Sequence, residues 1–347
     1  MNKRILRNAE WGILICSIIL FAIGLIALFS ATQETEYSEF KKQIMWFCIS
    51  IPVIVFVILL DYNVIAKVSP FFYGFFLILL IAVLFTKPIN GATSWFEITD
   101  TLKFQPSELA KIFVIMFLSW SIVKIQEKNK NNINKITRLL LILVIIGVPL
   151  LLIIKQPDYG TAMAFIVSTL LILFAAGIDK KYIIITALIV VISVPIIYMY
   201  ILPEHAKTRI EVFLNPDIDP RGAGYNIIQS KLAIGAGQLL GMGLLKGNQT
   251  QLGYLYPKTT DFIFSVIGEE LGFIFSGAVI IVYVVMITKA IKVAKTAKND
   301  LGSYIAVGIA RYIFISYDRK YRDDYGITAY YRCTFTICKL WRKFINY

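Results

Sequence analysis

The sequence has little of what most soluble enzymes use for chemistry. Its 347 residues include one histidine, His205, and four cysteines, and charged residues make up only 16%. It has no P-loop, no cysteine and histidine spacing of the zinc-binding kind, and no Ser/His/Asp set. P-loop phosphotransfer, structural zinc and serine-hydrolase chemistry are therefore not expected, and a single loop histidine is a weak catalytic candidate.

The cysteines do not indicate a disulfide framework. Cys16 and Cys48 lie in apolar runs, where a small buried hydrophobic side chain is the simpler interpretation. The first apolar run, 11–29, is long enough to cross a membrane and lacks a small-residue cleavage site. We therefore expect it to be a membrane span and not a cleaved signal peptide.

Apolar residues dominate instead. They make up 58% of the chain, and aromatic residues make up 14%, whereas soluble domains hold about 45–50% apolar residues. This composition predicts an all-α, polytopic integral membrane helix bundle. The net charge of +13 would suggest nucleic acid binding in a soluble protein. Here it is better explained by basic cytoplasmic loops, and no nucleic acid partner is expected.

The apolar runs give the predicted membrane spans. Each is close to the ~20 residues that a bilayer requires. The long polar segment 203–260 separates the seventh run from the eighth, and a ninth run begins near Tyr304. The predicted spans are 11–29, 45–60, 68–85, one opening at 104–111, 139–154, one ending near 176, 182–201 and 262–287.

Basic residues predict the orientation. If the N-terminus is cytoplasmic, the basic leader, the 124–138 loop, the 179–181 turn and the 289–298 loop all fall on the inner side, as the positive-inside rule requires. The same count places 91–111, 155–161 and 203–261 together on the outer side. Three separately encoded polar segments are therefore expected to meet at one membrane face.

Charged residues at this outer face are the first site candidates. Glu108 and Lys111 are three apart on one helix and can pair. Glu269 and Glu270 lie two turns inside a span, so they need partners or a wet cavity. The alternatives are charges merely solvated at the interface and, for Asp261, a helix-capping aspartate. The converging residues are Glu108, Lys111, Lys155, Asp158, Asp261, Glu269 and Glu270.

The 203–260 loop contains two further patterns. Residues 227–234 have apolar side chains at helical spacing, which predicts a short amphipathic helix on the outer leaflet. A glycine-rich strip, 235–247, follows with Lys246. Such a strip can bring backbone N–H groups close to phosphate, but it is also typical of any flexible loop.

Five motifs follow one another along the chain. They are Phe104-Gln105-Pro106-Ser107-Glu108, Gln156-Pro157-Asp158-Tyr159-Gly160-Thr161, Gly222 to Lys231, Thr260-Asp261-Phe262-Ile263-Phe264 and Gly268-Glu269-Glu270-Leu271-Gly272. Taken together, they resemble the SEDS family of cell-wall polymerases (RodA, FtsW and SpoVE), and the run Gln249-Thr250-Gln251 favours the RodA branch. The resemblance covers residues 1 to about 310, in order, and departs from the family pattern at Lys258 and Thr260, just before Asp261.

The resemblance implies a fold of ten transmembrane helices in the bacterial cytoplasmic membrane. It also implies a peptidoglycan glycosyltransferase that polymerises lipid II, the undecaprenyl-pyrophosphate-linked disaccharide peptide, at the outer face of that membrane during elongation and cell-shape maintenance. The partners it implies are a class B penicillin-binding protein transpeptidase and elongation-complex proteins. Two other functions stay open: a lipid II flippase, and a non-catalytic scaffold for a transpeptidase.

The resemblance also assigns residues to an inverting reaction. Asp261 is the candidate base that takes the proton of the acceptor hydroxyl. The pyrophosphate leaving group needs cations, and a divalent cation such as Mg²⁺ or Mn²⁺ could share that task. The residues expected to bind substrate are Glu108, Lys111, Lys155, Asp158, Arg209, Arg221, Lys231, Glu269 and Glu270.

The tail from Arg311 changes character. It is rich in Tyr and Arg and cannot complete the ninth span. We reverse-translated residues 311–347 with AT-rich codons and moved the reading frame forward by one nucleotide. The resulting amino-acid sequence resembles the outer loop and the start of the tenth helix of the family, which are missing here. Tryptophan has a single codon, so Trp341 must give Gly in the shifted frame. We therefore expect an extra base at the Ala310/Arg311 junction, in the gene or its sequencing. The domains expected are a SEDS-type unit, 1–310, and an aberrant tail, 311–347, with about eight complete spans and a truncated ninth. A genomic insertion would leave this copy inactive.

Overall fold

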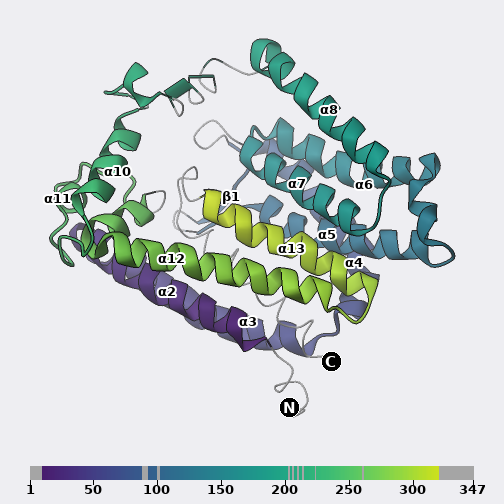
Figure 1. The fold of residues 1–347 in the computed structure, drawn as a ribbon, viewed down its shortest axis with the longest axis horizontal. Helices are drawn as coiled ribbons and strands as arrows, with labels where there is room; N and C mark the ends of the chain where they lie inside the picture. Colours follow the sequence, from purple (N-terminus) through teal and green to yellow (C-terminus); the bar gives the residue numbers. More distant parts are fainter. Residues whose placement is uncertain are drawn as a thin grey trace.

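The computed structural model describes residues 10–319, apart from 88–92, 100–101, 202–203, 205–206, 209–210, 213–214, 223 and 260–261. Long helices lie side by side in one bundle, and α8 runs along its edge (Figure 1).

The long helices follow the predicted order. Six of those described, α2, α3, α4, α6, α8 and α12, are long and apolar enough to cross a membrane. α5, α7 and α13 pack among them, and the prediction of a polytopic all-helical membrane protein is confirmed. The bounds are α2 (Trp11–Ala31), α3 (Ser38–Leu59), α4 (Tyr62–Ala82), α5 (Pro106–Gln126), α6 (Ile136–Lys155), α7 (Tyr159–Ala175), α8 (Lys180–Ile196, continued by a π-helical turn, Ile197–Ile201), α12 (Ile263–Lys295) and α13 (Asp300–Arg319).

The loops assigned to the cytoplasmic side do meet at one end of the bundle. Gln126, the last residue of α5, donates a hydrogen bond to the Ala176 carbonyl (2.8 Å) and accepts one from the Tyr304 hydroxyl (2.9 Å). Lys130 lies 3.6 Å from the carboxylate of Asp300. Two short helices, α10 (Tyr225–Ala236) and α11 (Asn248–Gln251), lie at the opposite end (Figure 1). The loops therefore sort into the two groups that the basic residues predict.

The core is built from helices far apart in sequence. In the main cluster, buried Ile13 and Ala27 of α2 belong with Val279 and Met286 of α12. Ile305, Ala306 and Ile309 of α13 are buried in the same cluster. Large side chains such as Phe71 (73% exposed) cover the outside of the bundle, where lipid tails take the place of water.

The last described helix, α13, extends into the segment predicted to be an aberrant tail. α13 continues as a backbone helix to Arg319, beyond the Ala310/Arg311 junction, and its side chains are described only up to Ala310. Residues 320–347 lie outside the described residues, so the frameshift, the domain boundary and the truncated ninth span stay predictions.

Two features of the outer segments differ from the expectation. A small antiparallel hairpin, β1 (Phe96–Thr99) and β2 (Leu102–Phe104), occupies the connection between α4 and α5, where no strand was predicted. The helix predicted at 227–234 is present as α10, and its buried Ser230 hydroxyl lies 2.6 Å from that of Ser265 in α12. The amphipathic helix therefore packs against the membrane bundle itself.

Candidate active site at the outer end of the bundle

A break in α12 organises the outer end. Gly272 has φ 79° and ψ −175°, which interrupts the helix within its apolar length. The break frees the carbonyls of Glu269 and Glu270 and the N–H groups of Phe273 and Ile274, and backbone groups at membrane depth must find partners inside the protein. The loop after α10 supplies them, with hydrogen bonds from Met242 N to Glu269 O (2.9 Å), Gly243 N to Glu270 O (3.1 Å), Phe273 N to Gln238 O (2.9 Å) and Ile274 N to Leu239 O (3.3 Å).

The glycine-rich strip makes this insertion possible. Gly241 has φ +84°, and a Cβ there would lie 2.1 Å from the carbonyl oxygen of Glu270. A Cβ on Gly237 would lie 1.8 Å from the carbonyl oxygen of Gly268. Gly237 and Gly241, two glycines of the strip that the sequence offers for phosphate binding, therefore allow one backbone to approach another closely.

Glu269 connects α12 to α11. Its side chain is fully buried, and both carboxylate oxygens accept hydrogen bonds. The donors are the backbone nitrogen of Gln249 (2.7 Å), the backbone nitrogen of Thr250 (3.0 Å) and the Thr250 hydroxyl (2.6 Å). Charge-assisted bonds of this kind are stronger than neutral ones, so Glu269 holds the α11 turn against α12.

Glu270 connects α12 to the first membrane helix. Its Oε1 accepts from the Ser30 hydroxyl (2.6 Å) and from Nε2 of Gln251 (3.0 Å). Its Oε2 is buried and has no hydrogen-bond partner among the described residues. Glu269 and Glu270, both predicted to bind substrate, thus accept hydrogen bonds from groups of the protein itself.

The first turns of α5 and α7 form a second polar cluster. Lys111 is 2% exposed, and its Nζ lies 2.5 Å from Oε1 of Glu108, which confirms the predicted pair. Asp158 caps α7 by accepting a hydrogen bond from the backbone nitrogen of Thr161 (2.9 Å) and also from its hydroxyl. It accepts a further bond from Nε2 of Gln105 (2.8 Å), which joins α7 to the start of α5.

The first turns of α5 and the start of α12 contribute to the same hydrophobic cluster. Ile112, which follows Lys111, belongs to the same buried cluster as Phe262 and Ile263. Those two residues directly follow Asp261. Asp261 and Arg209 themselves lie outside the described residues, so their assigned roles stay predictions.

The other cationic residues predicted to bind substrate form fewer contacts with the protein. Lys155, Arg221 and Lys231 are exposed, and within the described part of the chain none of them forms an ion pair. Lys258 is a different case, because its Nζ lies 2.9 Å from both Oε2 of Glu34 and the carbonyl oxygen of Thr250. It therefore fastens the segment just before Asp261 to the α2–α3 connection.

Several polar residues of the outer end were not predicted. Gln105 and Thr161 stand inside motifs that carry the family resemblance, so their importance could have been read from those motifs. Ser30, Gln249 and Thr250 act through partners far away in sequence, and no local pattern marks Ser30.

The described residues do not form a ready metal site. Among them, no group of three or more His, Cys, Asp or Glu side chains could hold a metal ion. Glu269 and Asp158 use both carboxylate oxygens in hydrogen bonds, and Glu108 is paired with Lys111.

The amino-acid sequence is similar to those of known proteins. Residues 10–318 match the model of a family described as cell cycle protein, which covers FtsW, RodA and SpoVE. The peptidoglycan glycosyltransferase MrdB of Escherichia coli K12 is 35% identical over 252 residues, which are 71% of this chain and 65% of MrdB. A probable peptidoglycan glycosyltransferase FtsW of Geobacter sp. M18 is 35% identical over 310 residues, 86% of this chain and 82% of that protein. The chain thus spans less than two thirds of the length of MrdB.

Solved structures share the fold. A chain from a structure titled for the structural coordination of polymerization and crosslinking by a peptidoglycan synthase complex superposes with a TM-score of 0.77 at 18% identity, covering 96% of this chain and 97% of that one. Thermus thermophilus RodA superposes with a TM-score of 0.67 at 18% identity, covering 96% of each chain. At this identity the likeness concerns the fold alone.

Proposed function

This chain belongs to the FtsW, RodA and SpoVE family, and on that premise we propose that it is a peptidoglycan glycosyltransferase that polymerises lipid II at the outer face of the bacterial cytoplasmic membrane. The proposal rests most on the position of buried charge. Among the described residues the buried charged side chains are Lys111, Glu269 and Glu270, and all three lie at the outer end of the bundle. Buried charges in a membrane protein are costly and typically functional.

The proposed reaction joins two sugars. The carboxylate of Asp261 takes the proton of the acceptor hydroxyl as that oxygen attacks the anomeric carbon of the donor. The bond from this carbon to the pyrophosphate oxygen breaks, and the lipid pyrophosphate leaves with the electron pair. One direct displacement inverts the anomeric centre, so an α-linked donor gives a β-linked strand.

The leaving pyrophosphate requires positive charge. Lys155, Arg221 and Lys231 are exposed and form no ion pair within the described residues, so they are free to approach it. Lys111 already has a carboxylate partner, and its proposed role is to fix Glu108 in the first turn of α5. No step is derived through Mg²⁺ or Mn²⁺; polymerisation with a chelator, and with each ion added back, tests that part of the proposal.

Glu269 and Glu270 take a different role in this proposal from the one first expected. Their bonds reach Gln249, Thr250, Gln251 and Ser30. They are positioning residues that keep the outer loop against α12, the helix that follows Asp261. The Gln249–Gln251 run favours the RodA branch. In this proposal its structural role is to supply the donors that bind Glu269 and Glu270.

The distribution of charge also separates the alternatives. A flippase needs a polar route for the headgroup through the full depth of the membrane. The buried charges of the described residues are confined to one end, which favours polymerisation over transport. A scaffold without catalytic activity would need no base. The scaffold hypothesis therefore predicts that replacing Asp261 does not change the amount of polymer formed.

A transpeptidase partner belongs to the proposal as well. We propose a class B penicillin-binding protein and elongation-complex proteins as partners. Support comes from the shared fold with a chain of a peptidoglycan synthase complex. Co-purification from cells with a tagged copy of this chain tests the partnership.

The experiment that tests the activity uses purified protein in liposomes that contain labelled lipid II. Both the chain as given and a frame-restored chain should be assayed. We expect the frame-restored chain to form glycan strands that a muramidase digests. Lipid II movement between leaflets without polymer would instead support the flippase. If neither polymer nor lipid movement is detected, the scaffold function is the one that remains.

A further inference from the structure

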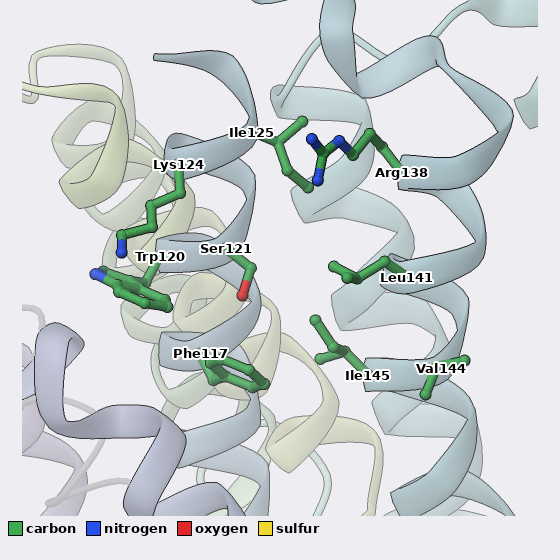
Figure 2. Close-up of a pocket in the computed structure, with 9 residues that line it drawn as sticks. All are labelled: Phe117, Trp120, Ser121, Lys124, Ile125, Arg138, Leu141, Val144 and Ile145. Atoms are coloured by element: carbon green, nitrogen blue, oxygen red, sulfur yellow. The ribbon is translucent and has the colours of Figure 1, made fainter.

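A cleft opens between α5 and α6 at the inner end of the bundle, far from the outer site. Its volume is about 510 Å³, and it is lined by the last turns of α5 and the first turns of α6 (Figure 2). Gln126 and Lys130 contact the other loops of this end, which the positive-inside rule assigns to the cytoplasm. The cleft therefore opens at the level of the cytoplasmic leaflet.

The upper end of the cleft is basic. The Arg138 side chain extends from α6 toward Ile125 of α5 (Figure 2), and it forms no ion pair within the described part of the chain. Lys124 stands at the rim with its Nζ 4.2 Å from the centre of the Trp120 ring. A tryptophan and a basic residue at this level are typical of a membrane interface.

The lower part of the cleft is apolar. Phe117, Leu141, Val144 and Ile145 line it. One polar group interrupts this wall: the hydroxyl of Ser121, which is 7% exposed and makes no hydrogen bond to another described residue. At ~1.5 Å rise per residue, Ser121 lies about 7–8 Å inside the end of α5, whereas Arg138 lies about 3 Å inside the start of α6.

We propose that this cleft binds one anionic phospholipid of the cytoplasmic leaflet. Its phosphate would lie against Arg138 with Lys124 at the rim, an ester oxygen would reach the Ser121 hydroxyl, and one acyl chain would follow Leu141 and Ile145. The order of cation, hydroxyl donor and apolar wall matches the order of phosphate, ester and chain in a phospholipid. A zwitterionic lipid offers the same chain but its own cation opposes Arg138. Basic pockets between membrane helices on the cytoplasmic side are known to hold anionic headgroups.

The test measures lipid retention and needs no enzymatic activity, so it is separate from the proposed polymerisation. Full-length protein is delipidated in detergent, mixed with phosphatidylglycerol or phosphatidylcholine, and analysed by native mass spectrometry. We expect one bound phosphatidylglycerol, retained roughly fivefold better than phosphatidylcholine. Arg138→Gln should remove this preference, while Lys128→Gln, an exposed cation at the same end but outside the cleft, should keep it.

A second variant tests the cleft without changing any charge. Val144→Trp fills the apolar part and should abolish retention of the bound lipid, while circular dichroism shows the helices intact. Equal retention of the two lipids by the unmodified protein would overturn the proposal. So would a preference for phosphatidylglycerol that survives both Arg138→Gln and Val144→Trp.

Discussion

Oε1 of Glu269, inside a membrane helix, lies 2.7 Å from the backbone nitrogen of Gln249 in the outer loop. Its Oε2 accepts two bonds from Thr250, so every part of this carboxylate faces a donor. The adjacent Glu270 differs, because its Oε1 accepts two bonds and its Oε2 has no partner within the described structure.

This difference predicts unequal effects of the same substitution at adjacent positions. Glu269→Gln must turn an NH₂ group toward an N–H or hydroxyl donor, so it should lower the free energy of unfolding by about 1.5–3 kcal/mol. Glu270→Gln can keep Oε1 as acceptor and place its NH₂ at the oxygen without a partner, so its loss should be smaller. Thermal unfolding of the two purified variants in detergent measures the difference. Equal losses would show that the bonds to Glu269 do not hold the loop.

The backbone insertion at the break of α12 predicts a steric effect at Gly241. Gly241 and Gly253 both have positive φ, +84° and +73°, so alanine strains both by about 1–2 kcal/mol. Only at Gly241 would the new methyl group meet a backbone oxygen, at 2.1 Å, which adds about 1–3 kcal/mol of overpacking. Gly241→Ala should therefore unfold at a clearly lower temperature than Gly253→Ala. If the two variants are equally stable, the loop does not pack into the helix break as described.

The positive-inside rule predicts which end of the bundle faces outward. In a variant without its native cysteines, a cysteine at exposed Asn248 should react with a membrane-impermeant maleimide added to intact cells. A cysteine at exposed Asn131 should react only after the membrane is opened. The reverse pattern would invert the topology and move the proposed site to the cytoplasm.

The sequence alone was sufficient for the helices and their grouping. Long apolar runs indicate which helices contact lipid, basic loops indicate which loops share one end of the bundle, and the Glu108–Lys111 pair follows from helical spacing. The break at Gly272 was not predicted, because the backbone groups that stabilise it lie in the distant 238–243 segment. Ser30 was missed for the same reason, since its partner Glu270 is at the other end of the chain.

The substrate-binding assignments stay predictions, because hydrogen bonds and burial within the protein do not identify a ligand. A buried carboxylate at a membrane face suggests a ligand, but the same desolvation cost is met when a loop supplies the donors, as it does for Glu269. Asp158 likewise combines a helix cap with a bond to Gln105. Exposed cations such as Lys155 show no partner that would identify their function.

The predicted extra base at the Ala310/Arg311 junction is tested by reading the DNA around that codon. We expect one base fewer than the sequence implies if the error arose in sequencing. Charged residues such as Arg311 and Lys320 each cost about 2.5–3.5 kcal/mol at the centre of a membrane helix. If the insertion is genomic, the product should therefore be degraded and inactive. A clean read in the present frame together with a stable, active product of 347 residues would contradict this.

The most direct test of the proposed function is the amount of glycan polymer that the Asp261→Asn variant forms from purified lipid II. Asparagine is nearly the same size as aspartate but cannot act as the base. We predict that the frame-restored protein makes polymer and that Asp261→Asn, with an unchanged unfolding temperature, makes none. Polymer at the unmodified level from a folded Asp261→Asn variant would contradict the account.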